Sequence, residues 1–318
     1  MLSIKKISSS DKKFSENLKN NILQRKFNTS GIKDKVKDII SEVRKNGDEA
    51  LIKFSGKYDN YYIDNAKDLE IPKEKFLEAL DKISKEELEA LKYAKKRIEE
   101  FASHQKSKSW DYTSEEIKLG EKITPINKVG IYVPGGSAVY PSSVLMNAVP
   151  AKVAGVKEII MVVPSPNGEV NNLVLAAAHL GGVDRLFRIG GAHAIAALAI
   201  GTNTIPKVNM IVGPGNQYVA EAKKELYGEV GIDSFAGPSE ILIIADSKAN
   251  ISWIVADLFS QAEHDVLAQS ILISPDKDLL QKVEEHILKE LPNQERKGII
   301  KESLQNFGLL INSKKIGR

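Results

Sequence analysis

The stretch "VGIYVPGGSAVYPSSVLMNAVPAKVAG" (129–155) joins a short apolar run to a helical segment, and this pairing decides the fold. The same pairing recurs at 158–181, 185–201 and 208–228, and each apolar run ends in glycine or proline. The runs do not alternate apolar and polar residues, which is typical of strands buried on both faces. Repeated strand–helix units of this length predict a parallel sheet with helices on its faces.

The sequence on either side of these repeats differs in character. Residues before about 125 are rich in Lys and Glu, with a helical apolar face at Val36, Ile39, Ile40 and Val43. Gly47 is expected to end that helix, and Ser84 with Glu87 predicts a capping box on another. After residue 247, a helix, a strand, a second helix and a last apolar run (307–313) indicate further α/β structure.

Composition excludes several classes of protein. The 318 residues include 45 Lys and Arg against 42 Asp and Glu, a net charge of +3, and the lysines are dispersed, so nucleic acid is not an expected partner. The chain has no cysteine, which excludes disulfides, thiolate zinc sites and a cysteine nucleophile. The sequence contains neither a secretory signal nor an apolar stretch long enough to span a membrane, and we expect a cytoplasmic protein.

Three glycine-containing loops follow predicted strands: "VPGGSA" (133–138), "IGGAHA" (189–194) and "VGPGNQ" (212–217). Ligands of parallel α/β sheets bind outside the carboxyl ends of the strands, where glycine lets the backbone approach and helix N-termini attract anions. A phosphate-bearing ligand such as a dinucleotide or phosphosugar fits this placement. Neither standard phosphate-loop motif is present, and tight turns that serve only the fold are the alternative.

The segment "QAEHD" (261–265) follows a helical apolar stripe and carries Gln261 and His264 three residues apart. This spacing puts both side chains on one flank of a helix. An imidazole and an amide oxygen so placed can ligate a zinc-type ion if two or more other groups complete the site. The alternative is a histidine bonded to a carboxylate or carbonyl at a helix end, with a solvated glutamine.

Taken together, "VGIYVPGGSAVYPSSVLMNAVPAKVAGVKEI", "GGAHAIAALAIGT", "VGPGNQYVAEAKKELYG", "AGPSEILIIAD" and "DLFSQAEHD" resemble the histidinol dehydrogenase family, in register from about residue 30 onward. The resemblance implies a zinc- and NAD-dependent homodimeric oxidoreductase. Such an enzyme oxidises L-histidinol to L-histidinal and then to L-histidine, the last two steps of histidine biosynthesis.

The resemblance also implies roles for individual residues. Tyr132, His193 and Asn216 match positions that contact NAD, although the family usually has glutamine where this chain has His193. Ser239 matches a substrate-contacting serine. Gln261 and His264 match two zinc ligands that also lie against the substrate.

The family's fold implies a Rossmann-like parallel-sheet domain, residues 132–238, inserted into a second α/β domain formed by 27–131 and 239–318. A helical arm is expected over 1–26. The family's acid–base Glu-His pair, and the Asp and His that complete its zinc site, lie beyond the position of residue 318. We therefore expect a truncated chain that binds zinc poorly and turns over slowly or not at all.

Two other functions remain open from the sequence. One is a non-catalytic module of the same fold that binds a nucleotide or a protein partner. The other is an α/β enzyme that uses a phosphosugar or nucleotide, which would bind phosphate without depending on zinc.

Overall fold

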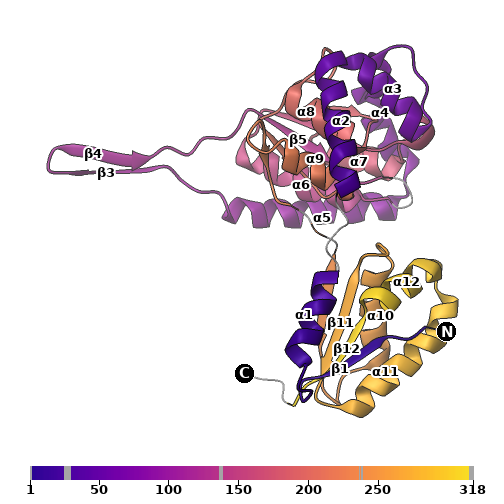
Figure 1. Ribbon diagram of the computed structural model, residues 1–318. Coiled ribbons are helices and arrows are strands. Elements are labelled where there is room, and N and C mark those ends of the chain that lie inside the picture. Colours follow the sequence, from indigo (N-terminus) through magenta and orange to yellow (C-terminus); the bar gives the residue numbers. More distant parts are fainter. Residues whose placement is uncertain (1, 25–29, 136–138, 236, 238, 315–318) are drawn as a thin grey trace. The chain divides into compact units, whose positions relative to one another are not determined.

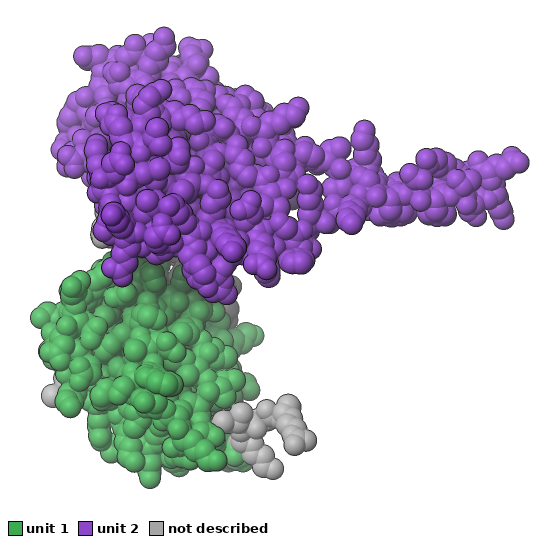
Figure 2. Space-filling model, turned by 180° about the vertical axis from the view of Figure 1, so that it is seen from behind, with its two compact units in different colours: residues 1–29, 237–318 green, residues 30–236 purple. Residues whose placement is uncertain are grey.

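The computed structural model describes residues 2–24, 30–135, 139–235, 237 and 239–314, and the chain divides into two compact units. Unit 1 comprises Met1–Thr29 and Gly237–Arg318, and unit 2 comprises Ser30–Ala236 (Figure 2). Both contain parallel strands with helices, and unit 2 interrupts the sequence of unit 1. The predicted fold class, one α/β domain inserted into another, is confirmed.

Unit 2 is built on one central sheet. Among the described residues, its strands in spatial order are β2 (Glu70–Ile71), β7 (Arg185–Phe187), β6 (Glu158–Val162), β5 (Lys128–Tyr132), β8 (Met210–Val212) and β9 (Gly231–Ile232). Only β2 pairs antiparallel to its neighbour; the remaining pairs are parallel. The chain runs outward from β5 to β7, then returns to β8 on the other side of β5. This reversal is the topological switch point of a doubly wound sheet.

Helices cover both faces of this sheet because its strands send apolar side chains to each side in turn. Ile160, Val162 and Tyr132 face one core, and Ile159, Met161 and Ile131 face the other. The first core is closed by α2 (Ser30–Asn46), α3 (Asp48–Asp59), α8 (Gly191–Ile200) and α9 (Gln217–Glu225). The second is closed by α4 (Lys73–Glu78), α5 (Lys85–His104), α6 (Pro141–Ala154) and α7 (Asn172–Gly181) (Figure 1).

Two local signals in the sequence have the predicted outcome. Gly47 follows α2 with a φ of 51°, a left-handed conformation that glycine adopts without strain. The Ser84 side chain accepts a hydrogen bond from the Glu87 N–H, while the Glu87 carboxylate accepts one from the Ser84 N–H. This capping box fixes the start of α5.

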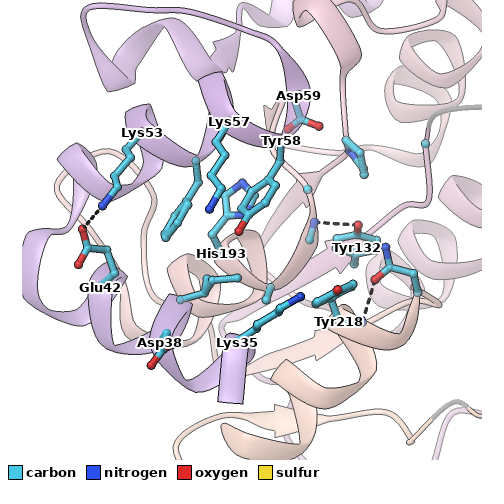
Figure 3. A pocket seen from close by; sticks show the side chains of 18 of the residues that line it. Lys35, Asp38, Glu42, Lys53, Lys57, Tyr58, Asp59, Tyr132, His193 and Tyr218 are labelled. Atoms are coloured by element: carbon cyan, nitrogen blue, oxygen red, sulfur yellow. Dashed lines mark hydrogen bonds and ion pairs between the residues drawn. The ribbon is translucent and has the colours of Figure 1, made fainter. Parts of the chain in front are cut away.

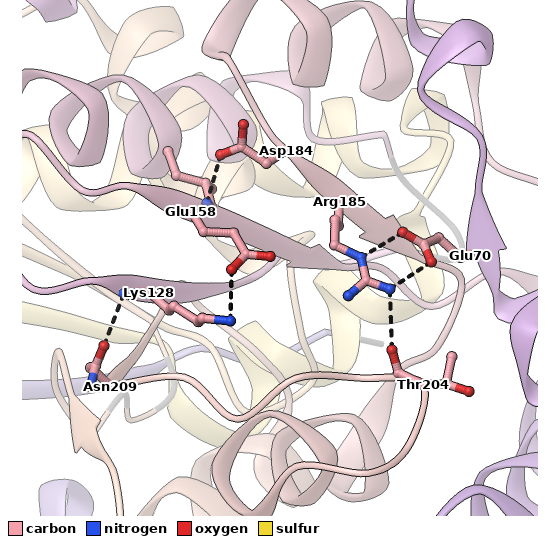
Figure 4. A network of polar contacts seen from close by, with 8 residues as sticks. Glu70, Lys128, Glu158, Asp184, Arg185, Thr204 and Asn209 are labelled. Carbon is pink, nitrogen blue, oxygen red and sulfur yellow. Dashed lines mark hydrogen bonds and ion pairs between the residues drawn. The ribbon is translucent and has the colours of Figure 1, made fainter.

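A polar network ties the strands together at their amino ends (Figure 4). The Arg185 guanidinium donates to both carboxylate oxygens of Glu70, at 2.6 and 2.7 Å, and to the Thr204 carbonyl at 3.2 Å. The Lys128 ammonium pairs with Glu158 at 2.8 Å across β5 and β6. These contacts hold the edge strand β2 against β7 and fix β5 against β6. They lie at the edge of the sheet opposite to the glycine loops.

Unit 1 contains a smaller parallel sheet. In its described part the strands lie in the order β1 (Lys5–Ser8), β12 (Leu309–Asn312), β11 (Gln269–Ser274) and β10 (Glu240–Ile244). A core of apolar side chains joins this sheet to α10 (Ile251–Ala262), α11 (Lys277–Glu290) and α12 (Lys297–Phe307). On the other side, α1 (Phe14–Gln24) contributes Phe14 and Leu18 to a cluster with Ile7 and Ile311.

The domain boundaries differ from the expected ones in two places. The segment expected as a helical arm over 1–26 begins with β1, which pairs with β12 from Lys5↔Leu309 to Ser8↔Asn312 and is part of the unit 1 sheet. Residues 30–131, which we expected to accompany 239–318, belong to unit 2. The reason is that α2, α3 and α5 bury their apolar faces on the sheet that carries the glycine loops.

One hairpin lies outside both cores of unit 2. Strands β3 (Trp110–Ser114) and β4 (Ile117–Glu121) pair antiparallel, and all of their residues are exposed (Figure 1). Trp110, Tyr112 and Leu119 lie on one face of the hairpin, with the two aromatic rings stacked at 6.2 Å. Elsewhere in the described chain, we find no helix with the length and apolar character to cross a membrane.

The amino-end network generates a stability prediction. Glu70→Gln removes the charge from a bidentate pair that is about two-thirds buried, and we expect it to lower the free energy of unfolding by about 1 kcal/mol. Urea unfolding measures this change. The control is Glu89→Gln, which breaks the exposed Lys92–Glu89 pair and should cost less than about 0.5 kcal/mol. Equal effects of the two substitutions would contradict the role given to Arg185.

Candidate functional site

A cavity of about 840 Å³ opens at the carboxyl ends of the unit 2 strands (Figure 3). The loops after β5, β6, β7 and β8 form one wall, with Pro134, Pro164, Gly190 and Asn216 among the lining residues. Helices α2 and α3 form the opposite wall. The cavity therefore lies at the switch point between β5 and β8, where doubly wound sheets bind their ligands.

The structure brings the three predicted glycine loops to this cavity. Each loop contributes at least one residue to the lining of the cavity: Gly135 from the first, Gly191 from the second and Asn216 from the third. Residues 136–138 of the first loop lie outside the described residues. The packing is close: a Cβ on Gly190 would lie 2.4 Å from a ring carbon of Pro164, and one on Gly135 would lie 2.5 Å from the Pro164 carbonyl oxygen. Glycine is required at both positions because the loops pack against Pro164 too closely to admit a side chain.

Tyr132 is the last residue of β5 and fixes one loop against another. Its hydroxyl oxygen accepts a hydrogen bond from the Gly191 N–H at 3.0 Å. Burial raises the pKa of Tyr132 to about 12, and the nearby Asp59 carboxylate acts in the same direction. The phenol therefore stays protonated at neutral pH, and its O–H remains available as a donor to a ligand.

His193 lies in the first turn of α8 and is only 2% exposed. Its ring packs against Phe54, at 5.3 Å between centroids, and against Tyr58 at 5.7 Å, both from α3. Burial lowers the pKa of His193 to about 3, so the imidazole is neutral at physiological pH. Within the described structure its Nε2 atom is buried without a hydrogen-bond partner.

Asn216 caps the helix that follows β8. Its side-chain oxygen accepts hydrogen bonds from the N–H groups of Tyr218 and Val219, at 3.0 and 3.2 Å. The loop before it turns at Gly213, which has a φ of 106° and whose added Cβ would lie 2.1 Å from the Tyr132 carbonyl oxygen. The turn thus holds the start of α9 beside the end of β5.

A partly buried ion pair fixes the same turn. The Lys223 ammonium, whose side chain is 4% exposed, donates to the Gly213 carbonyl and to Asp233 Oδ1, both at 2.6 Å. Asp233 Oδ2 accepts from the Gly213 N–H at 2.8 Å. Both backbone polar groups of Gly213 are therefore satisfied by side chains, and the loop that carries Asn216 is fixed.

Helix α3 contributes a carboxylate that sequence reasoning did not identify. Asp59 lines the cavity, is 8% exposed, and has an Oδ2 atom without a partner in the described residues. Burial raises the pKa of Asp59 to about 6. A signal for it exists in "GKYDN" (56–60): a carboxylate at the last position of a helix opposes the helix dipole.

The remaining predicted residues lie in unit 1. Gln261 is in the last turn of α10, half-buried, and its Nε2 atom is buried without a partner among the described residues. His264 is exposed just beyond the helix, and its N–H donates to the Gln261 carbonyl at 3.3 Å. Ser239 is exposed before β10, and its carbonyl accepts from the Gln269 N–H at 3.0 Å.

Gln261 and His264 do not form a complete metal site. The part of the chain that the structure describes contains no group of three or more His, Cys, Asp or Glu side chains arranged to hold a metal ion. An amide oxygen and an imidazole are nevertheless acceptable zinc ligands, and no described residue hydrogen-bonds the Gln261 Nε2 atom. The donors present fit part of a zinc site.

Comparison with known proteins agrees with this geometry. The family model for histidinol dehydrogenase matches residues 23–318. The chain belongs to the histidinol dehydrogenase family. It is 50% identical over 309 residues to the histidinol dehydrogenase of Pseudomonas savastanoi pv. phaseolicola, covering 97% of this chain and 69% of the relative. For the Methylococcus capsulatus enzyme the identity is 51%, over 97% and 71% of the two chains.

A solved structure supports the same assignment. The crystal structure of histidinol dehydrogenase from Elizabethkingia anophelis superposes with a TM-score of 0.87 at 33% identity. The match covers 99% of this chain and 72% of that one. The fold of this family member is therefore shared with a histidinol dehydrogenase along nearly its whole length.

The clamp on Gly213 predicts the effect of Lys223→Met. Removing the ammonium leaves the Gly213 carbonyl without a donor and Asp233 without its cation, so we expect the free energy of unfolding to fall by about 1 to 3 kcal/mol. Urea unfolding is the measurement. Lys92→Met, which breaks the exposed Lys92–Glu89 pair, should change stability by less than about 0.5 kcal/mol. A Lys223 variant as stable as the control would refute the clamp.

The raised pKa of Asp59 predicts a pH-dependent gain in stability for Asp59→Asn. Between its ordinary value of 3.8 and about 6, the folded protein holds a proton that the unfolded chain has released, so stability falls as pH rises through this window. Above about pH 6 the carboxylate is ionised in both the folded and the unfolded chain, and the full free-energy cost of burying its charge is present. The asparagine variant should therefore be more stable at pH 7 by about 1 to 3 kcal/mol, with little difference at pH 4.

Urea unfolding of both proteins at pH 4 and pH 7 tests this. The comparison is made within each pH, so that other titrating groups contribute equally to the two proteins. A stability difference that is the same at both pH values would contradict the burial of an ionised Asp59.

Proposed function

We propose that this chain binds NAD in the unit 2 cavity and contributes Gln261 and His264 to a zinc site, as part of an enzyme that oxidises L-histidinol to L-histidine. The observation that carries the proposal is the meeting of Tyr132, His193 and Asn216 around one cavity at the switch point of the sheet. These residues come from three different strand–helix units, separated by more than twenty positions each.

The cavity has chemistry suited to a dinucleotide. Lys35, Lys53 and Lys57 line it, and Lys53 is already paired with Glu42 at 2.8 Å. Ammonium groups and the N-termini of α8 and α9 favour the pyrophosphate. The neutral ring of His193 can hydrogen-bond as the family's usual glutamine can, so its presence is compatible with cofactor binding.

Different residues of this chain would have different roles in the reaction. NAD, held by Tyr132, His193 and Asn216, would supply a hydride acceptor, and zinc would supply a Lewis acid for the nitrogens of the substrate. Gln261 and His264 would hold the metal, and Ser239 would contact the substrate. His193 takes no part in proton transfer at neutral pH because it is buried with a pKa of about 3. Its role is to bind and orient the cofactor.

A second function from another class is a module of the same fold that binds NAD or a protein without catalysis. The observation favouring it is that the described chain holds two zinc-type donors rather than a full ligand set. Such a module would bind NAD equally well with and without zinc and histidinol. A phosphosugar-utilising enzyme would likewise need no metal, so zinc dependence separates both from the proposal.

Calorimetry and a spectrophotometric assay on the 318-residue protein test the proposal. We expect NAD to bind, and zinc to bind about tenfold to a hundredfold more weakly in Gln261→Ala and His264→Ala, with NAD affinity unchanged in both. His286→Ala, on α11, is the matched histidine control. Any NADH formed should require histidinol, NAD and zinc together. NAD binding with no zinc affinity above that of the variants would support the non-catalytic module instead.

A further inference from the structure

Among the described residues, Asp59 has no hydrogen-bond or ion-pair partner that explains why a carboxylate stands at this position. It is the last residue of α3 and is 8% exposed, and none of the described residues hydrogen-bonds its buried Oδ2 atom. The helix end itself is satisfied by the following residue, Asn60, whose N–H donates to the Ser55 carbonyl from a left-handed conformation. In the part of the chain that the structure describes, the carboxylate therefore neither caps the helix nor forms an ion pair.

Three effects make the ionised side chain unfavourable in the ligand-free protein. Burial removes water from the carboxylate and raises its pKa to about 6. An unpartnered buried acceptor loses the hydrogen bonds that it makes to water in the unfolded chain. The negative end of the α3 dipole also disfavours an anion. Polar groups held at such cost are characteristic of binding sites, because a ligand supplies the missing donors.

The chemistry of the cavity indicates which kind of ligand group could donate hydrogen bonds to the Asp59 carboxylate. A carboxylate repels phosphate groups, so we expect the anionic centre of a dinucleotide to lie nearer to Lys35, which Figure 3 shows across the cavity from Asp59. The vicinal hydroxyls of a ribose offer two adjacent O–H donors, which match the two oxygens of one carboxylate. In dinucleotide-binding folds an acidic residue recognises the ribose in this way. There it comes from the sheet, whereas Asp59 comes from a helix in the opposite wall.

The neighbour of Asp59 fits the rest of a nucleoside. Tyr58 lines the same cavity, is 50% exposed, and its ring stacks on Phe54 at 5.7 Å between centroids. Figure 3 shows the Tyr58 ring between Asp59 and His193. A flat, half-exposed ring beside a carboxylate is complementary to a planar base beside a sugar diol. We propose that the Asp59 carboxylate accepts hydrogen bonds from the 2′- and 3′-hydroxyls of one ribose of the bound dinucleotide, an inference that rests on the proposed NAD site.

Calorimetric titration of NAD into the wild-type chain and Asp59→Asn is the primary test. We expect the substitution to weaken NAD binding about tenfold to a hundredfold, the loss typical of a charge-assisted hydrogen bond. Asp34→Asn is the matched control, because it removes the same charge from an exposed carboxylate of α2 that does not line the cavity. Its NAD affinity should stay within about twofold of wild type.

Deoxy analogues separate contact with the sugar from a structural effect. NAD analogues that lack the 2′-hydroxyl of one or the other ribose are titrated into both proteins. If Asp59 bonds that hydroxyl, its removal weakens binding to wild type but has little further effect in Asp59→Asn. The analogue whose loss of binding free energy is not additive with that of Asp59→Asn identifies which of the two riboses contacts Asp59. If it is the adenosine ribose, NADP binds more weakly than NAD to wild type, and Asp59→Asn reduces the difference.

The outcomes distinguish the two proposals. Wild type that binds NAD, with Asp59→Asn unchanged or with strictly additive losses for both analogues, overturns the role of Asp59 and leaves the NAD site intact. Wild type that fails to bind NAD overturns both. Since Asp59→Asn is expected to stabilise the free protein, a thermal melt at pH 7 shows that weaker binding does not come from unfolding.

Discussion

The direction in which the strands of unit 2 run is the constraint on which its other features depend. Because β5, β6, β7 and β8 are parallel, their carboxyl ends meet at one edge of the sheet, and each gives rise to a loop there. The reversal of strand order on either side of β5 separates the loops enough to leave a cavity. Residues far apart in the sequence become neighbours through topology alone.

The two edges of this sheet are used differently. At the amino ends, charged side chains are satisfied, as in the Arg185–Glu70 pair and the Lys128–Glu158 pair. At the carboxyl ends, His193 and Asp59 are buried with polar atoms that no described residue satisfies. The carboxyl-end edge therefore retains groups whose hydrogen-bonding capacity is available to a ligand.

Much of this architecture could be predicted from the sequence because the relevant signals are local. Apolar runs ending in glycine predicted the strands of unit 2, and Ser84 with Glu87 predicted the start of a helix. The glycine loops predicted one wall of the cavity. The opposite wall could not be predicted, since the packing of α3 on α8 depends on long-range contacts. For the same reason the pairing of β1 with β12 was missed, and the segment was assigned to an arm.

That pairing has a consequence for the order of events during synthesis on the ribosome. Strand β1 is made first, but its partner β12 ends at Asn312, so the smaller sheet cannot close until nearly the whole described chain has emerged. Unit 2 is contiguous in sequence and can fold while the rest is still being translated. In the nascent chain β1 thus stays unpaired until a partner some three hundred residues later in the sequence has been made.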